Sequence, residues 1–171
     1  FGSDKTVIML WQGLHIRYIR TLLKSAINEV VDEIKKLQQE NGVNLRNIIV
    51  DEDGVGGGVK DYLRCQGFTN NARALKGENY QNLKTQCYYK LADQINKGQI
   101  GVSCSDVNIK NYITEELEQV RTKDADKDNK LQIIPKDTVK AILGRSPDYA
   151  DALAMRMYYE IDSNFGKYYV Q

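Results

Sequence analysis

Hydrophobic residues near the start of the chain follow the pattern of a β-hairpin and then of a helix. Residues 5–23 read KTVIMLWQGLHIRYIRTLL, which is rich in β-branched and aromatic residues on both sides of Gly13. This pattern predicts two antiparallel strands joined near Gln12 and Gly13. In residues 27–42 the apolar positions recur at helical spacing, and Gly42 stands just after the last of them. An amphipathic helix is therefore expected there.

The middle of the chain predicts a buried strand and a short helix. Ile48, Ile49 and Val50 are consecutive and apolar, which is typical of a strand covered on both faces. Residues 58–67, GVKDYLRCQG, favour a short helix, and residues 72–78, ARALKGE, are interpreted as a further strand with its exit.

The second half of the chain is mostly helical in pattern. A polar hairpin is expected in residues 121–135, with its tip near Asp128 and Asn129. Ser146 is expected to be the N-cap of the last helix, with Pro147 in its first turn. The predicted helices are residues 79–98, 108–120, 136–144 and 146–161. Since the order is strands, helix, strand and then helices, we expect a single α/β domain over residues 1–171, with a mixed central sheet and helices on both faces.

Composition narrows the function only slightly. Lys and Arg number 24 and Asp and Glu number 23, so the net charge of +1 gives no overall attraction to nucleic acid, and a DNA partner needs a local basic face. The three cysteines contain no C-x-x-C pair, which argues against a zinc knuckle or a disulfide framework and favours a reducing, intracellular compartment. No apolar stretch is long enough to span a bilayer. The chain starts at Phe1, so we expect a fragment of a longer protein.

Acidic and glycine residues follow the central strand. Residues 48–58 read IIVDEDGVGGG, which places Asp51 and Asp53 at the end of the strand, before a glycine-rich loop. A dinucleotide-binding motif starting at Gly54 needs glycine where Val59 stands, and the glycine-lysine pair of a P-loop is absent. The loop is either an ordinary strand-to-helix turn or a place where a ligand approaches the backbone closely. With carboxylates before it, that ligand could be a metal ion or a phosphodiester held by one.

A second pair of acids lies in the last helix. Asp148 and Asp151 are three positions apart and share a helix face. Asp148 suits the first turn because of the helix dipole, so structural and functional interpretations of it are equally good. Asp151 is followed by ALAM, and a buried acid costs several kcal/mol unless it is paired or binds a metal. For Asp151 we favour a functional role.

Other candidate residues have ordinary explanations. His15 is the sole histidine and lies in a strand pattern with no nucleophile nearby, so a catalytic triad is not indicated. Lys84, Lys90 and Lys97 lie on the polar side of one predicted helix. Such a side is usually solvated, although it could also follow a DNA backbone.

An acid at the end of a central strand and an acid in a late helix can meet at one point. Two Mg²⁺ ions roughly 3.5–4 Å apart need such a cluster for phosphodiester hydrolysis. The order of strands and helices also fits the ribonuclease H-like architecture.

Three segments, VDEDGVGGGVKDYL, NLKTQCYYKLADQINKGQI and IPKDTVKAILGRSPDYADALAM, resemble the C-terminal nuclease domain of tailed-bacteriophage large terminase subunits. The resemblance runs in order over nearly the whole chain. It implies a ribonuclease H-like, Mg²⁺- or Mn²⁺-dependent endonuclease that cuts concatemeric double-stranded DNA by a two-metal mechanism. It also implies work with an ATPase domain, a small terminase subunit and a portal in the cytoplasm of the bacterial host.

The resemblance also implies roles for particular residues. Asp51 matches the strand-end metal ligand and Asp151 the late-helix ligand, and both are the expected catalytic residues. Asp53 and Asp148 are neighbours that bind the metal directly or through water. Lys136 is expected near a phosphate.

Further DNA contacts are expected at Lys84 and at Gly56 and Gly57, where the glycines let the cut strand or a loop lie close to the metals. One departure from the family stands out. Its first metal ligand is an aspartate on a strand just before the turn that FGSDKT resembles, and this chain begins inside that turn. We therefore expect poor metal binding, slow or no cutting, and an open sheet edge.

Three alternatives stay open from the sequence. The first is another ribonuclease H-like nuclease, such as a junction resolvase or transposase core, which GRSPDYADALAM disfavours. The second is a non-catalytic docking module of the packaging motor. The third is a nucleotide-binding α/β domain, which the glycine spacing disfavours.

Overall fold

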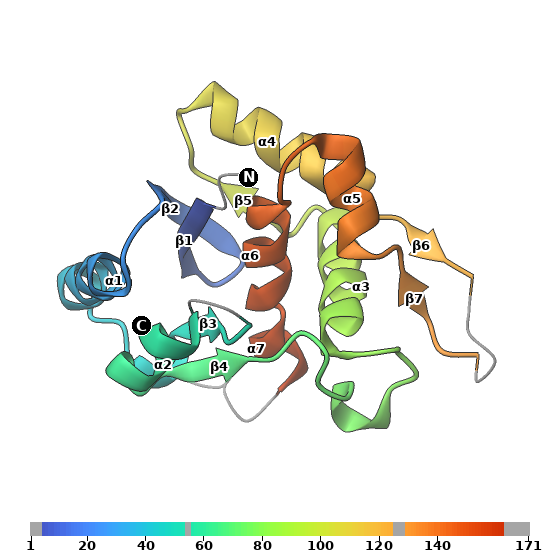
Figure 1. Ribbon diagram of the computed structural model, residues 1–171, viewed down its shortest axis with the longest axis horizontal. Coiled ribbons are helices and arrows are strands. Elements are labelled where there is room, and N and C mark those ends of the chain that lie inside the picture. The colour runs from blue at the N-terminus through green and yellow to red at the C-terminus, as the bar shows by residue number, and fades with distance from the viewer. Residues whose placement is uncertain (1–4, 54–55, 125–128, 163–171) are drawn as a thin grey trace.

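The computed structural model describes residues 5–53, 56–124 and 129–162 (Figure 1). Its strands are β1 (Lys5–Gln12), β2 (His15–Leu23), β3 (Ile49–Asp51), β4 (Gln66–Phe68), β5 (Gly101–Val102), β6 (Thr122–Lys123) and β7 (Gln132–Ile133). Its α-helices are α1 (Ile27–Asn41), α2 (Gly56–Leu63), α3 (Leu83–Asn96), α4 (Val107–Gln119), α5 (Lys136–Leu143), α6 (Asp148–Arg156) and α7 (Tyr158–Ile161). No helix in these ranges is both long and apolar enough to cross a membrane.

The strands pair in both directions. β1 and β2 form the expected antiparallel hairpin, with Gly13 in the left-handed region at the turn, and β2 also pairs with β5 in parallel. β3 and β4 form a separate parallel pair, and β6 and β7 form an antiparallel pair. Within the described residues, β1 and β3 are each the last strand of their sheet. The prediction of a mixed α/β fold is confirmed, although the described strands fall into three sheets.

Helices cover both faces of the layer that contains β1 and β3. Neighbouring residues of a strand point to opposite faces, and the two strands divide their apolar residues in the same way. Met9 of β1 and Ile49 of β3 pack against the core formed largely by α3 and α6, whereas Ile8 and Val50 pack against the buried residues of α1 and α2. β1 and β3 thus lie between the same two groups of helices, as the sequence predicted.

One predicted element is wrong, and another is confirmed with different bounds. Residues 72–78 do not form a strand, because Lys76 and Gly77 have positive φ angles of 57° and 67°, and Leu75–Gly77 is a short 3₁₀ helix. The short helix predicted for residues 58–67 ends at Leu63, and the chain then turns at Arg64 into β4. Both β4 and β5 are too short to show a pattern in the sequence.

The last predicted helix is shorter than expected and is broken. Ser146 is not its N-cap, because α6 begins at Asp148 and its N-cap position is Pro147, which offers no side-chain acceptor. The helix ends at Arg156, and α7 follows after Met157. α6 runs through the middle of the molecule, where it contacts α3, α4, β1 and β3 (Figure 1). Its buried residues explain the apolar pattern around Asp151.

Candidate active site

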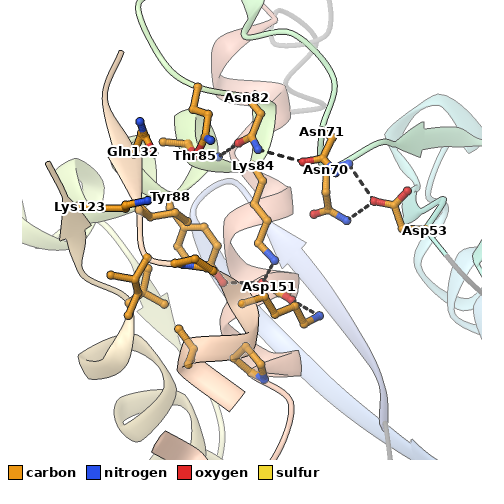
Figure 2. A pocket seen from close by; sticks show the side chains of 18 of the residues that line it. Asp53, Asn70, Asn71, Asn82, Lys84, Thr85, Tyr88, Lys123, Gln132 and Asp151 are labelled. Carbon is orange, nitrogen blue, oxygen red and sulfur yellow. Dashed lines mark hydrogen bonds and ion pairs between the residues drawn. The ribbon is translucent and has the colours of Figure 1, made fainter. Parts of the chain in front are cut away.

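A pocket of about 450 Å³ lies between the end of β3, the start of α3, the β7–α5 segment and α6. Five charged residues that the sequence singles out line it: Asp51, Asp53, Lys84, Lys136 and Asp151. Figure 2 shows Asp53 and Asn70 on one side and Lys84, Tyr88 and Asp151 on another. The fold thus brings the strand-end acids and the late-helix acid to one cavity.

The β3 side of the pocket is an acid pair held by one amide. The side-chain amide of Asn70 donates to Asp51 Oδ1 at 3.0 Å and to Asp53 Oδ2 at 2.7 Å, and the Asp53 N–H donates to Asp51 Oδ1 at 3.0 Å. Burial raises the pKa of Asp51 above its ordinary value, and the nearby charges of Asp53 and Asp151 add to the rise while the two hydrogen bonds oppose it. Among the described residues, no lysine, arginine or histidine forms an ion pair with Asp51 or Asp53.

The glycines after these acids have a structural reason to be glycine. A Cβ at Gly56 would overlap the carbonyl oxygen of Asp51, because α2 begins directly against the end of β3. A Cβ at Gly58 would come within 2.8 Å of Ile27 Cδ1. The start of α2 therefore leaves no room for a side chain between Gly56 and the backbone of Asp51. Neither Gly56 nor Gly57 lines the pocket, so contact of these two residues with DNA stays a prediction.

The α6 side of the pocket is an acid surrounded by donors. Asp151 Oδ1 accepts a hydrogen bond from the Tyr88 hydroxyl at 2.6 Å and lies 2.6 Å from Lys84 Nζ, while Lys136 Nζ lies 2.7 Å from Oδ2. Burial raises the pKa of Asp151, but the two lysines outweigh it and leave the pKa below its ordinary value. The sequence required a partner for this buried acid, and the partners are two lysines and a tyrosine.

The two lysines come from the first residues of different helices. Lys136 begins α5, and Lys84 is the second residue of α3, whose N-cap Asn82 accepts from the Thr85 N–H at 2.9 Å. Burial lowers the pKa of Lys136, yet Asp151, Asp148 and Asp51 outweigh this and raise it.

The three lysines of α3 do not act as one basic side. Lys84 is largely buried and pairs with Asp151, whereas Lys90 pairs with Glu78 and Lys97 with Asp93. The expectation of a shared solvated face is therefore wrong for Lys84, because its position in the first turn directs it into the pocket.

Asp148 is used differently from Asp151. Its Oδ2 accepts from the backbone N–H of Lys5 at 3.1 Å, which ties the start of α6 to β1, and it does not line the pocket. Its charge still reaches the site, since it raises the pKa of Lys136. Binding of a metal by Asp148 stays a prediction.

The donor set has the chemistry of a divalent-cation site. Carboxylate and amide oxygens suit Mg²⁺ or Mn²⁺, and Mg²⁺ is commonly held by one or two carboxylates with water and substrate phosphates completing its shell. Asp51 and Asp151 can supply such a pair, with Asp53 behind Asp51. Among the described residues, however, no three histidine, cysteine or acidic side chains converge closely enough to hold an ion.

Solved structures show where this fold occurs. The nuclease domain of the large terminase subunit gp2 of bacterial virus Sf6 matches 91% of this chain and 83% of its own length, with a TM-score of 0.74 and 24% identity. A mutant of that domain with manganese and beta-thujaplicinol matches the same shares, with a TM-score of 0.77 and 23% identity. The chain has the fold of a phage large-terminase nuclease domain.

The terminase fold also extends to a more distant protein. The large terminase nuclease of thermophilic phage G20c matches 92% of this chain and 77% of its own length, with a TM-score of 0.57 and 16% identity. No protein-family model matches the sequence, and no curated protein matches it. The resemblance read from the sequence motifs is confirmed at the level of this fold.

Two residues of the pocket were missed from the sequence. Asn70 bridges Asp51 and Asp53, but it lies in a loop after β4, and an asparagine there reads as a turn residue. Tyr88 lies in a helix, where a buried tyrosine usually packs, and it does pack, yet its hydroxyl donates a hydrogen bond to Asp151. The spacing from Lys84 to Tyr88 is one helical turn, which is the signal that could have placed both on the face toward Asp151.

Proposed function

We propose that this chain is a metal-dependent DNA endonuclease domain that cleaves concatemeric double-stranded DNA for a viral packaging motor. The observation that supports this most is the pocket that gathers Asp51 and Asp151 from opposite sides, with Lys84 and Lys136 beside them. Carboxylates can hold divalent cations, and lysines can bind the phosphates of a nucleic acid. The terminase-nuclease fold makes DNA the most reasonable source of those phosphates.

Asp51 and Asp151 would hold the cation, and Asp53 and Asp148 would bind it directly or through water. Bound Mg²⁺ or Mn²⁺, two ions in the full mechanism, would supply an activated water and stabilise the leaving oxygen. Manganese is named with one of the similar structures and calcium with another, which is consistent with divalent-cation chemistry in this fold. Asn70 would keep the two β3 acids in one orientation while they bind a cation.

The two lysines would act on the phosphate rather than on the acid. In the structure they neutralise Asp151, so the pocket is stable with a buried carboxylate in it. When a cation takes over Asp151, both ammonium groups are released close to the place where a phosphodiester must lie. Lys136 and Lys84 would then bind its oxygens, which gives this nearly neutral chain the local basic face that DNA binding requires.

The family resemblance supplies the wider context of the proposal. The proposed domain would cover residues 1–171 and work with an ATPase domain, a small terminase subunit and a portal in the cytoplasm of a bacterial host.

Plasmid nicking in Mn²⁺ tests the nuclease directly. This chain, a longer chain that adds the implied strand, and an Asp151→Ala version of each would be incubated with supercoiled DNA. We expect nicking and relaxation of the plasmid, and we expect Asp151→Ala to abolish them in both chains. Absence of cleavage in every form, with Mg²⁺ as well as Mn²⁺, would refute the proposal.

A non-catalytic docking module is the second candidate. The observation in its favour is that Asp151 already has three partners and needs no metal to be stable. A docking module would fold and bind motor components equally well in chelator and in Mn²⁺. Isothermal titration with Mn²⁺ separates the two candidates, because only the nuclease requires binding that Asp51→Ala and Asp151→Ala each remove.

A further inference from the structure

The start of α6 lacks a cap of its own and receives one from another helix. Its N-cap position is Pro147, which offers no side-chain acceptor, and the first N–H of the helix to find a partner inside it is that of Asp151, which donates to the Pro147 carbonyl at 2.9 Å. The N–H groups before it need acceptors from elsewhere. The carboxylate of Glu116, in α4, accepts from the Ala150 N–H at 2.8 Å.

Glu116 is an unusual residue for this position. It is a fully buried acid, with 0% of its surface exposed. Burial raises its pKa, while hydrogen bonds from the backbone of Ala150 and Tyr149 and an ion pair with Arg145 oppose the rise. A buried carboxylate destabilises the fold unless both of its oxygens have hydrogen-bond or ion-pair partners, so the stability of the fold depends on the partners of Glu116. Its negative charge at a helix N-terminus is favourable, because the exposed N–H groups there carry partial positive charge.

The residues around Glu116 hold the same turn of α6. Tyr112, one turn earlier in α4, stacks on Tyr149 with the ring centroids 5.9 Å apart and the planes 8° apart. The Arg145 guanidinium lies 4.4 Å from the centre of the Tyr112 ring. Tyr149 also shares a hydrogen bond of 2.9 Å with Thr21 of β2. Residues of α4 and of β2 therefore hold the first turn of α6 in place.

We propose that Glu116 is a positioning residue for the site, which sets the first turn of α6 and through it the place of the Asp151 carboxylate in the pocket. Ala150 directly precedes Asp151, so a shift of the Ala150 N–H moves the Asp151 backbone with it. Glu116 does not itself line the pocket, and its side chain bonds Ala150 of α6 and pairs with Arg145. This inference rests on the proposed nuclease function for its consequence, but the positioning can be measured without cleavage.

Three variants test it. Glu116→Ala removes the acceptor, Glu116→Gln keeps an oxygen that can accept from Ala150 while losing the charge, and Glu115→Ala is the matched control. Glu115 is the neighbouring acid of α4 and also pairs with Arg145, at 3.0 Å, but unlike Glu116 it forms no hydrogen bond with the described residues of α6. Amide hydrogen exchange would be followed residue by residue in all three, under conditions where each remains folded.

We expect Glu116→Ala to speed exchange of the Ala150 and Asp151 amides at least about 10-fold more than exchange in α3. In the same variant the Mn²⁺ concentration for half-maximal binding should rise by about 10-fold, as for other residues that orient ligands. Glu116→Gln should recover most of both effects, and Glu115→Ala should show neither. If Glu116→Ala speeds exchange uniformly over the chain, or leaves Mn²⁺ binding unchanged, Glu116 only stabilises the fold and the inference is wrong.

The outcome for Glu116 can be told apart from the outcome for the nuclease. If the unaltered chain neither binds Mn²⁺ nor nicks DNA in its longer form, the proposed function fails, and the exchange comparison still decides whether Glu116 sets the first turn of α6. If the unaltered chain binds Mn²⁺ and Glu116→Ala binds it equally well, the proposed function stands and the positioning role is overturned.

Discussion

The two acidic sides of the pocket are opposites in their electrostatics. Asp151 is buried and paired with two lysines and a tyrosine, and its pKa is lowered. Asp51 is partly buried beside another acid, has only N–H donors as partners, and its pKa is raised. Without a cation, the charge of Asp151 is balanced by its partners, whereas the charge of Asp51 is disfavoured by burial and by the nearby acids. We call Asp151 the satisfied acid and Asp51 the strained acid. The proposed cation would therefore gain most on the β3 side, whereas on the α6 side it would have to displace Lys84 and Lys136 from Asp151.

Removing the satisfied acid should have the largest effect. Asp151→Ala leaves Lys84 and Lys136 without their partner inside the pocket, and breaking a buried pair in this way is strongly destabilising. We expect a loss of roughly 2–3 kcal/mol in the free energy of unfolding without metal, a little below the usual range because Lys136 is 38% exposed. Urea denaturation measures it. Asp93→Ala, which breaks the exposed pair with Lys97, is the control and should change stability by less than about 0.5 kcal/mol.

The same replacement should remove cleavage. A metal-bound site supplies several kcal/mol of transition-state stabilisation, so loss of a ligand should lower nicking by the longer chain at least about 100-fold. Retained nicking in Asp151→Ala would show that Asp151 is a structural acid whose only role is to pair with the lysines.

Removing the charge of the strained acid, Asp51, should raise the free energy of unfolding, which is the opposite of the effect expected at Asp151. Asp51→Asn keeps an oxygen for the Asp53 N–H and removes a charge that burial and its neighbours disfavour. We expect the metal-free protein to become more stable at neutral pH, although Mn²⁺ binding is lost. Thermal unfolding with chelator and with Mn²⁺ would show both. A variant less stable than the parent under chelator would contradict the contrast between the two sides.

The pH dependence of stability should differ between the sides as well. The ordinary pKa of both acids is 3.8. Asp151, whose pKa is lowered in the fold, stabilises above that value, and this contribution is lost as pH falls through its lower pKa. Asp51, whose pKa is raised, costs stability progressively as pH rises from 3.8 through its higher pKa. Metal-free Asp51→Asn should accordingly gain on the parent as pH rises through that window, which denaturation at a series of pH values would show.

The amide that joins the two β3 acids should matter for metal binding more than for stability. Asn70→Ala removes the shared donor of Asp51 and Asp53, so the two carboxylates lose their fixed relation. Residues that orient ligands in this way typically contribute about 10–100-fold in metal affinity. Mn²⁺ titration calorimetry measures this. Asn71→Ala is the matched control, since Asn71 bonds Asn82 instead of an acid, and it should leave the affinity unchanged.

The smallest effect is expected at the tyrosine. Tyr88→Phe removes the 2.6 Å hydrogen bond to Asp151 and keeps the buried ring. A hydrogen bond to a charged group contributes about 1.5–3 kcal/mol, and two lysines remain to satisfy Asp151, so we expect the lower end of that range. Tyr89→Phe removes only a 3.4 Å bond to the Gln132 carbonyl and should be nearly silent. If urea denaturation showed the same loss of unfolding free energy in Tyr88→Phe and in Tyr89→Phe, the hydrogen bond from Tyr88 to Asp151 would add nothing to stability.

The long, patterned elements were predictable from the sequence and the short ones were not. The hairpin of β1 and β2 and the helices α1, α3 and α4 have enough residues to show a period, and the structure confirms them. β4 and β5 have three and two residues, so pairing with a neighbouring strand creates them. The segment 72–78 was misread because Leu75 and its neighbours look like a strand until the positive φ angles are known.

The sequence by itself singled out the acids that line the pocket, Asp51, Asp53 and Asp151. A carboxylate at the end of an apolar strand and one inside an apolar helix both stand out against their surroundings, and the motifs around them indicated the terminase fold. The tertiary structure alone decided what those acids touch. Asn70 reaches Asp51 and Asp53 from a loop, Lys84 and Lys136 reach Asp151 from two helix starts, and Glu116 caps α6 from α4. Such contacts join residues far apart in the chain, and no periodic pattern records them, because they depend on how the loops place whole helices.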